Sequence, residues 1–111
     1  MDEDLPTALW VQLHLRQADL DAIPAVVTRK GDPHRGTILL KLAQHPEGWR
    51  VLNQARDGKG QRAWLAALQG AVVAETEANA YIAKAVARDG DLWVIEIDDR
   101  DGRNPFPGQQ L

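Results

Sequence analysis

The sequence predicts an α+β fold in which two helices pack against a mainly antiparallel sheet of four to five strands. Two segments, residues 6–21 and 75–88, carry apolar residues at helical spacing, and β-rich runs bounded by turn residues make up most of the rest. A length of 111 residues, with 44% hydrophobic and 26% charged residues, suits one globular domain with a single core. We therefore expect one compact domain over residues 1–103 and a flexible tail over residues 104–111.

The first element depends on an ambiguous pattern. In LWVQLHLR every second residue is leucine or valine, as in a strand, whereas Leu9, Trp10 and Leu13 also fit a helical stripe. Residues 7–16 are thus compatible with either structure. The continuation RQADLDA has no turn residue and Pro24 closes it, which favours the helix.

The middle of the chain predicts four strands. AVVTRK and GTILLKL flank GDPHR, where Gly31, Asp32 and Pro33 supply the turn residues of a β-hairpin. These two strands are therefore expected to pair with each other in antiparallel fashion. WRVLNQA follows the turn HPEG and predicts a third strand with side chains alternating between two faces. A short fourth strand is predicted near residues 62–67, after the connector RDGKG.

The second helix, ETEANAYIAKAVAR, has the clearest pattern in the chain. Its apolar residues recur at the i, i+3, i+4 spacing of one helical face, which makes Tyr81 a buried anchor. Gly90 ends the helix, and LWVIEI then predicts the last strand. Three apolar residues share the buried face of this strand: Trp93, Ile95 and Ile97. The opposite face carries Val94, Glu96 and Asp98.

Charge is unevenly distributed along the chain. The net charge of −3 is made up of −4 over residues 1–27, +5 over residues 28–62 and −4 over residues 63–111. A basic middle between acidic flanks is most simply explained by cancellation within the fold. A basic face that binds a ligand is the alternative.

Three features of composition bear on location. The absence of cysteine fits a reducing compartment, and the N-terminus MDEDLP lacks the basic and apolar regions of a signal peptide. No apolar run approaches the roughly 18 residues that a membrane span requires. We expect a cytoplasmic protein that makes no membrane contact.

The acidic end of the last strand is a candidate metal site. Glu96 and Asp98 project from one face and Asp99 follows, and carboxylate oxygens are the ligands that Mg²⁺ and Mn²⁺ prefer. The run does not match the calcium-loop pattern, and acidic residues also end strands simply by solvating them. The favoured interpretation is a solvated strand end in which Arg100 and Arg103 are ion-pair partners. A metal-dependent hydrolase is the alternative.

The turn RKGDPHRG is a candidate anion site. Backbone amides in a glycine turn beside Arg29, Lys30 and Arg35 can surround an anion. The turn lacks the lysine and Ser/Thr ending of a P-loop, and charged turns are usually only solvated. Anion or nucleic-acid binding through these residues is therefore the lesser interpretation, and the four tryptophans are expected in the core.

Several catalytic classes are excluded by residue type. The chain has no serine and no cysteine, so a serine or cysteine hydrolase is ruled out. Its three histidines do not have the spacing of a zinc helix. No cofactor motif is identified, and no cofactor is expected.

Three stretches together resemble a known family: LWVQLHLR, IPAVVTRKGD with GTILLKL, and EANAYIAKAVARDGDLWVIEIDDRDGR. They are similar to small bacterial proteins classed as domain of unknown function 1491. The resemblance covers nearly the whole chain and is most specific where the tyrosine helix runs into DLWVIEIDDR. It implies a compact bacterial cytoplasmic domain and supplies no catalytic residues.

These observations favour a non-catalytic interaction or binding module that uses a sheet edge or a tryptophan-rich surface. The expected partner is another protein or a second copy of the chain. Anion or nucleic-acid binding and metal-dependent hydrolysis stay as the two alternatives.

Overall fold

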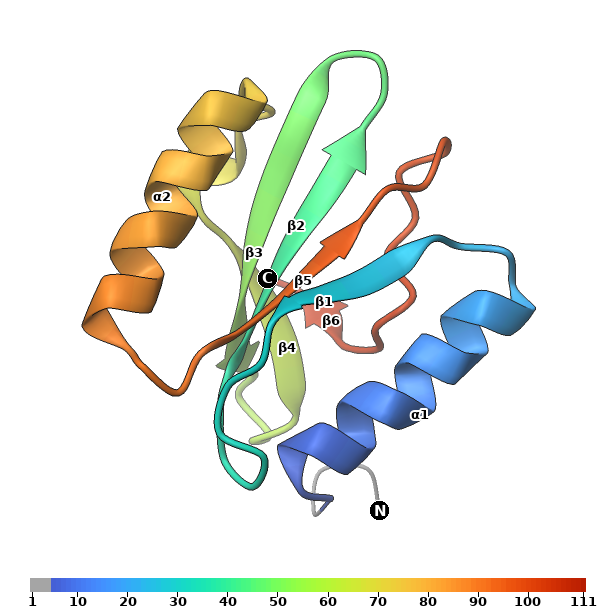
Figure 1. The fold of residues 1–111 in the computed structure, drawn as a ribbon, viewed down its shortest axis with the longest axis vertical. Coiled ribbons are helices and arrows are strands. Elements are labelled where there is room, and N and C mark those ends of the chain that lie inside the picture. Colours follow the sequence, from blue (N-terminus) through green and yellow to red (C-terminus); the bar gives the residue numbers. More distant parts are fainter. Residues whose placement is uncertain (1–4) are drawn as a thin grey trace.

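Two helices lie on opposite faces of one mixed β-sheet (Figure 1). The structure is a computed structural model that describes residues 5–111. The helices are α1 (Thr7–Leu20) and α2 (Glu75–Arg88), and a short 3-10 turn, η2 (Leu68–Gly70), precedes α2. The strands are β1 (Ala25–Arg29), β2 (Ile38–Gln44), β3 (Gly48–Arg56), β4 (Arg62–Ala66), β5 (Trp93–Ile97) and β6 (Gln109–Gln110). The predicted α+β class is confirmed, but the sheet has six strands and is mixed.

The strand order is β1-β5-β2-β3-β4-β6. The last long strand, β5, lies between β1 and β2, antiparallel to the first and parallel to the second. The predicted hairpin between β1 and β2 is therefore wrong. The apolar residues of β5, interrupted only by Glu96, are typical of a strand that is covered on both faces of the sheet. The turn residues between β1 and β2 instead carry the chain across the end of β5.

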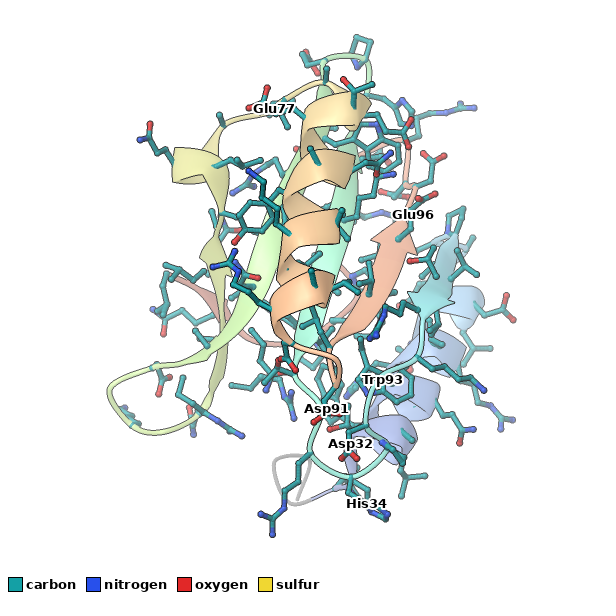
Figure 2. The ribbon with its side chains drawn as sticks, turned by 60° about the vertical axis from the view of Figure 1, so that its left-hand side comes forward. Asp32, His34, Glu77, Asp91, Trp93 and Glu96 are labelled. Atoms are coloured by element: carbon teal, nitrogen blue, oxygen red, sulfur yellow. The ribbon has the colours of Figure 1, made fainter. Side chains whose placement is uncertain are left out.

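Close backbone approach explains the two glycines of this crossover. A Cβ atom on Gly31 or Gly36 would overlap the carbonyl oxygen of Asp91, just before β5. The crossover is fastened there, because Asp32 N donates a hydrogen bond to Asp91 O (3.0 Å). The indole Nε1 of Trp93 donates to Asp32 O (2.8 Å). Figure 2 shows these three side chains gathered at one end of the sheet.

The helix α1 buries a different stripe from the one the sequence predicts. Its buried residues are Thr7, Trp10, Val11 and Ala18. Leu9, Leu13 and Leu20 are exposed on its outer side. The helix itself is as predicted, and the choice between helix and strand is settled by the contact of Trp10 and Val11 with the sheet core.

Each face of the sheet has its own core. The α1 face packs Trp10, Ile38, Leu40, Leu42, Leu52, Trp64, Trp93, Ile95, Ile97 and Phe106. The α2 face packs Leu39, Val51, Ala78, Leu92 and Val94, with Tyr81 half-buried against them. The Tyr81 hydroxyl accepts a hydrogen bond from Asn53 Nδ2 (2.8 Å). Val94 lies on the face opposite Ile95, as predicted, but α2 covers it and only 3% of it is exposed.

The C-terminal segment is packed against the domain and does not form the expected flexible tail. Phe106 is 2% exposed, and its ring lies 5.7 Å from that of Trp10 between centroids. Trp64 Nε1 donates to Pro107 O (3.1 Å), and β6 pairs in parallel with β4. One buried aromatic side chain and a short strand pairing therefore hold a segment whose proline and glycine content suggests coil.

The crossover makes a testable prediction about stability. Gly31→Ala should lower the free energy of unfolding by about 1–3 kcal/mol, because the new methyl group meets fixed backbone. Gly58→Ala is the control, since nothing lies within 4 Å of its added Cβ. Urea unfolding of both variants measures the difference. Equal losses in the two variants would contradict the close approach.

Candidate functional site

The three carboxylates predicted as a metal site have three different partners. Glu96 Oε1 lies 3.2 Å from Lys41 Nζ, and Asp98 Oδ1 lies 2.5 Å from His45 Nε2. Asp99 is paired with Arg103. Across residues 5–111 no three His, Cys, Asp or Glu side chains come together as a metal site would require. The structure does not gather Glu96, Asp98 and Asp99 around one point.

Lys41 is buried and forms an ion-pair cluster with two more exposed carboxylates on the α2 face. It is 5% exposed, its Nζ lies 2.6 Å from Glu75 Oε2, and it stands 4.5 Å from the centroid of the Trp49 ring. Burial by itself lowers the pKa of Lys41, but the hydrogen bonds and charges of Glu75 and Glu96 outweigh it and raise the pKa. The cluster fastens the first turn of α2 to the sheet, because Glu75 is the first residue of that helix.

Asp99 fixes the loop that leaves β5. It accepts hydrogen bonds from Arg103 Nε (3.0 Å) and Nη2 (2.8 Å), and from the backbone N–H groups of Asp101 (3.1 Å) and Arg103 (2.9 Å). The Arg103 side chain, helped by these backbone donors, holds the pKa of Asp99 well below its usual range. The predicted ion pairing of this arginine is confirmed, and its role is to shape the loop.

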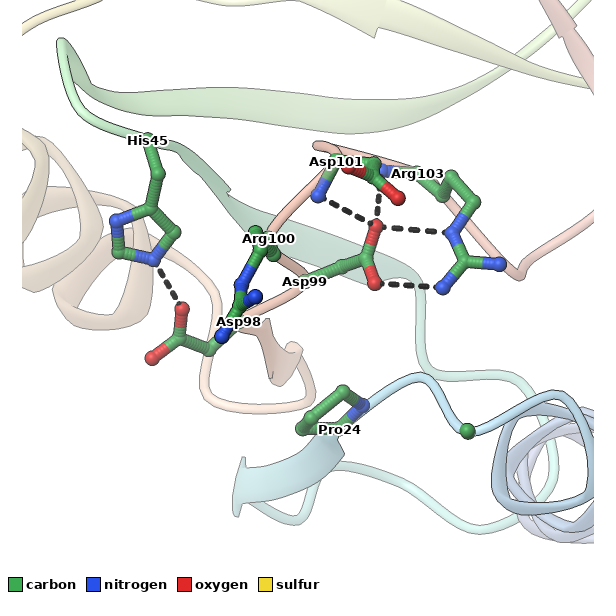
Figure 3. A pocket seen from close by; sticks show the side chains of 8 residues that line it. Pro24, His45, Asp98, Asp99, Arg100, Asp101 and Arg103 are labelled. Atoms are coloured by element: carbon green, nitrogen blue, oxygen red, sulfur yellow. Dashed lines mark hydrogen bonds and ion pairs between the residues drawn. The ribbon is translucent and has the colours of Figure 1, made fainter.

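A broad cleft of about 610 Å³ lies between this loop, the β2–β3 turn and the segment before β1 (Figure 3). It is lined by Ala22, Pro24, His45, Asp98, Asp99, Arg100, Asp101 and Arg103. His45 and Asp98 face each other across its rim, each with half of its side chain exposed. Such an exposed ion pair contributes little to stability. The histidine also has no serine or cysteine to activate as a nucleophile, because the chain contains neither residue.

The predicted anion site is occupied by a carboxylate of the chain itself. Asp32 Oδ2 accepts hydrogen bonds from the backbone N–H groups of His34 (3.1 Å) and Arg35 (2.7 Å). The bond from Arg35 contributes most to a lowered pKa of Asp32. Arg29 is also engaged, since its guanidinium donates to Leu92 O (2.6 Å) and Gly90 O (3.1 Å). Of the three predicted cations, Lys30 and Arg35 are exposed.

The outer edge of β1 is a border of the sheet without a neighbouring strand. This strand pairs only with β5, and Figure 1 looks onto its free side between the two helices. Val26, the second residue of the strand, is 56% exposed. Two grooves run beside β1, with α1 as their other wall. The larger, about 480 Å³, is lined by Ala8, Val11, Gln12, Leu15, Val27, Lys30, Gly31, Pro33 and Trp93. The smaller, about 280 Å³, is lined by Leu15, Asp19, Ile23, Pro24, Ala25, Val26, Glu96 and Asp98.

Sequence reasoning identifies a sheet edge as a candidate surface but does not place it at β1. A strand predicted to pair with β2 has no reason to stand at the border. A usable signal is the pair Arg29 and Lys30 at the strand's end, since basic residues are common on exposed edges. The tryptophan-rich surface does not exist, because Trp10, Trp64 and Trp93 are buried.

Fold and site define a small α+β domain with an open edge strand facing a helix. Comparison with known families matches residues 5–107 to "Protein of unknown function (DUF1491)". The chain belongs to this family, which confirms the resemblance seen in the sequence. No curated protein matches the chain.

Solved structures agree with this assignment. The crystal structure of a DUF1491 family protein from Caulobacter crescentus is 36% identical, with a TM-score of 0.85 over 96% of this chain and 99% of that chain. An NMR structure of a DUF1491 family protein from the same organism is 36% identical, with a TM-score of 0.83 over 97% of each chain. A solution structure from A. tumefaciens, 22% identical, has a TM-score of 0.72 over 96% of this chain and 97% of that chain and shows the shared fold. None of the helices in the described part is long and apolar enough to cross a membrane.

The Asp99 loop predicts a pH dependence of stability. Because its pKa is lower in the folded than in the unfolded chain, its contribution is complete above about pH 5 and is lost as the pH falls. Asp99→Asn should therefore be less stable than wild type at neutral pH, and the gap should shrink on acidification. Urea unfolding of wild type and variant at neutral pH and at acidic pH measures the difference in the free energy of unfolding. Asp91→Asn, at an exposed side chain, is the control, and a gap that stays constant with pH would count against the ion pair.

Proposed function

We propose that the protein is a non-catalytic binding module that accepts an extended polypeptide segment along β1. The observation that carries this proposal is the free edge of β1, bordered by two grooves that α1 helps to line. Addition of a strand to an exposed sheet edge is a common mode of peptide recognition. Backbone hydrogen bonds supply affinity in this mode, and pockets beside the strand supply specificity.

The backbone of β1 has groups directed toward such a segment. Asp98 N donates to Pro24 O (3.0 Å), and the register continues with Ala25 opposite Ile97 and Val26 opposite Glu96. In an antiparallel pair the residues that bond to the neighbour alternate with residues that point away from it. The N–H and C=O groups of Ala25 and Val27 therefore point to the open side.

The side chains beside the edge of β1 are mainly apolar and can contact every second side chain of an added apolar strand. Val27 lines the larger groove together with Val11 and Leu15 of α1, and Val26 lines the smaller. Successive side chains of an added strand would point to opposite faces of the sheet. Those on the α1 side would enter the space between helix and strand.

The two alternatives have less support. Metal-dependent hydrolysis needs carboxylates that share an ion, whereas Glu96, Asp98 and Asp99 each have another partner. Anion binding at the crossover competes with Asp32, which already accepts the amides of His34 and Arg35. The proposed setting is the bacterial cytoplasm, in line with a chain that lacks cysteine.

Peptide selection tests the proposal. Short peptides selected from a random library on the wild-type protein should bind Val26→Lys at least about tenfold more weakly, since a lysine on the edge opposes strand addition. Binding should also shift the amide NMR signals of Ala25 and Val27. Leu65→Lys is the matched control, because Leu65 is an equally exposed strand residue on β4. Peptides that bind Val26→Lys as tightly as wild type would contradict the proposal.

A further inference from the structure

We propose that the segment accepted by β1 is β1 of a second copy, which gives a dimer with one continuous antiparallel sheet. This inference rests on the proposed function, because it names the partner of the same edge. It is carried by self-complementarity: the exposed carboxylate of Asp19 lies beside the start of β1 and the exposed amine of Lys30 follows its end, and neither has an ion-pair partner among residues 5–111.

The start of β1 is acidic. Asp19 of α1 lines the smaller groove beside Pro24 and Ala25, together with Glu96 and Asp98. Glu96 and Asp98 are already paired with Lys41 and His45. Asp19 is exposed and forms no ion pair with any residue in the range 5–111. It is therefore the carboxylate at this end that a partner can use.

The other end of β1 carries two basic residues, Arg29 and Lys30, close to Asp32 and Asp91. Arg29 is committed to the carbonyl oxygens of Gly90 and Leu92. Lys30 is exposed, lines the larger groove, and has no ion-pair partner among the described residues. Within residues 5–111, Asp19 and Lys30 are thus two exposed, opposite charges without an ion-pair partner, one beside each end of β1.

Antiparallel pairing of two such strands brings opposite charges together twice. In a two-fold symmetric interface, if a residue of the first copy contacts a second residue of its partner, the partner makes the same contact with the first copy. Lys30 of each copy then approaches Asp19 of the other. A parallel arrangement would instead place the two lysines side by side and the two aspartates side by side, which costs free energy.

The backbone favours a register centred on Val26. If Val26 of one copy lies opposite Val26 of the other, Ala25 of each copy lies opposite Val27 of its partner. Ala25 and Val27 are the residues whose N–H and C=O groups point outward, so both pairs can exchange hydrogen bonds. The exposed Val26 side chains meet at the centre, which removes apolar surface from water.

The arrangement uses the side of β1 that has no neighbouring strand. In Figure 1 β1 crosses in front of the sheet, with α1 and α2 to either side of it. A two-fold axis perpendicular to the sheet leaves both α1 helices on one face and both α2 helices on the other. The bulge between Val27 and Arg29 limits the regular pairing to the first part of the strand.

Two charge-reversal variants, studied alone and mixed, test whether β1 pairs with a second copy. Sedimentation equilibrium should show concentration-dependent dimerisation of the wild type that weakens with added salt. Lys30→Glu and Asp19→Lys should each weaken the dimer by about tenfold or more, because each change turns two attractive contacts into repulsive ones. An equimolar mixture of the two variants should recover the wild-type affinity, since both contacts in the mixed dimer are again attractive. Lys59→Glu, an exposed change of the same charge in the β3–β4 loop, should have no effect.

Amide hydrogen exchange gives a second readout that does not depend on variants. Exchange at Ala25 and Val27 in the wild type should slow as the protein concentration rises, whereas Leu65 should show no change. A wild type that is monomeric up to millimolar concentration, or a variant mixture no tighter than its components, overturns the second-copy proposal. Selected peptides that still bind through Val26 in that case would leave the proposed function standing. Failure of both experiments would overturn both proposals.

Discussion

The insertion of β5 between β1 and β2 is the constraint on which the rest of the structure depends. Its apolar residues fill both cores, with Ile95 facing α1 and Val94 facing α2, so it can occupy only a central position. Once β5 is there, β1 is displaced to the border of the sheet and the connection between β1 and β2 must cross the end of β5. Gly31 and Gly36 permit that crossing, because a side chain at either position would overlap Asp91. The open edge is thus a direct consequence of how the core is filled.

The same insertion determines how the charges are used. Parallel pairing places Lys41 of β2 opposite Glu96 of β5, and Glu75 of α2 completes the cluster. One basic group from the middle of the chain, Lys41, therefore meets two acidic groups from its last third. Arg29 contributes in another way, since it donates hydrogen bonds to the carbonyl oxygens of Gly90 and Leu92, in the segment between α2 and β5. Charged side chains that have no ion-pair partner within the fold are the ones available to a binding partner.

Local patterns in the sequence predict the elements of this fold far better than their pairing. The period of apolar residues places α2 and the strands from β1 to β5, because each signal lies within a single segment. The first helix is instead predicted by the lack of turn residues before Pro24. Pairing is decided by distant segments: GDPHR has the residues of a hairpin turn, and nothing local shows that β5 enters between the strands it joins. The metal hypothesis fails to gather its residues for the same reason, since Glu96 and Asp98 share a face but meet Lys41 on β2 and His45 in the β2–β3 turn. Phe106 was missed because one buried aromatic residue in a proline-rich segment has no periodic signal.

An exposed edge strand needs features that limit unwanted pairing, and β1 has several. It is short, at five residues, and a bulge follows Val27. Lys30 and Asp19 at its two ends repel a parallel copy and attract an antiparallel one. Backbone hydrogen bonds alone would accept almost any extended chain, so selectivity has to come from these flanking charges and from the grooves beside α1. A surface that discouraged every partner would have a charge in place of Val26. The apolar residue at the centre, between opposite charges at the ends, is the arrangement expected of an edge that pairs with one partner in one orientation.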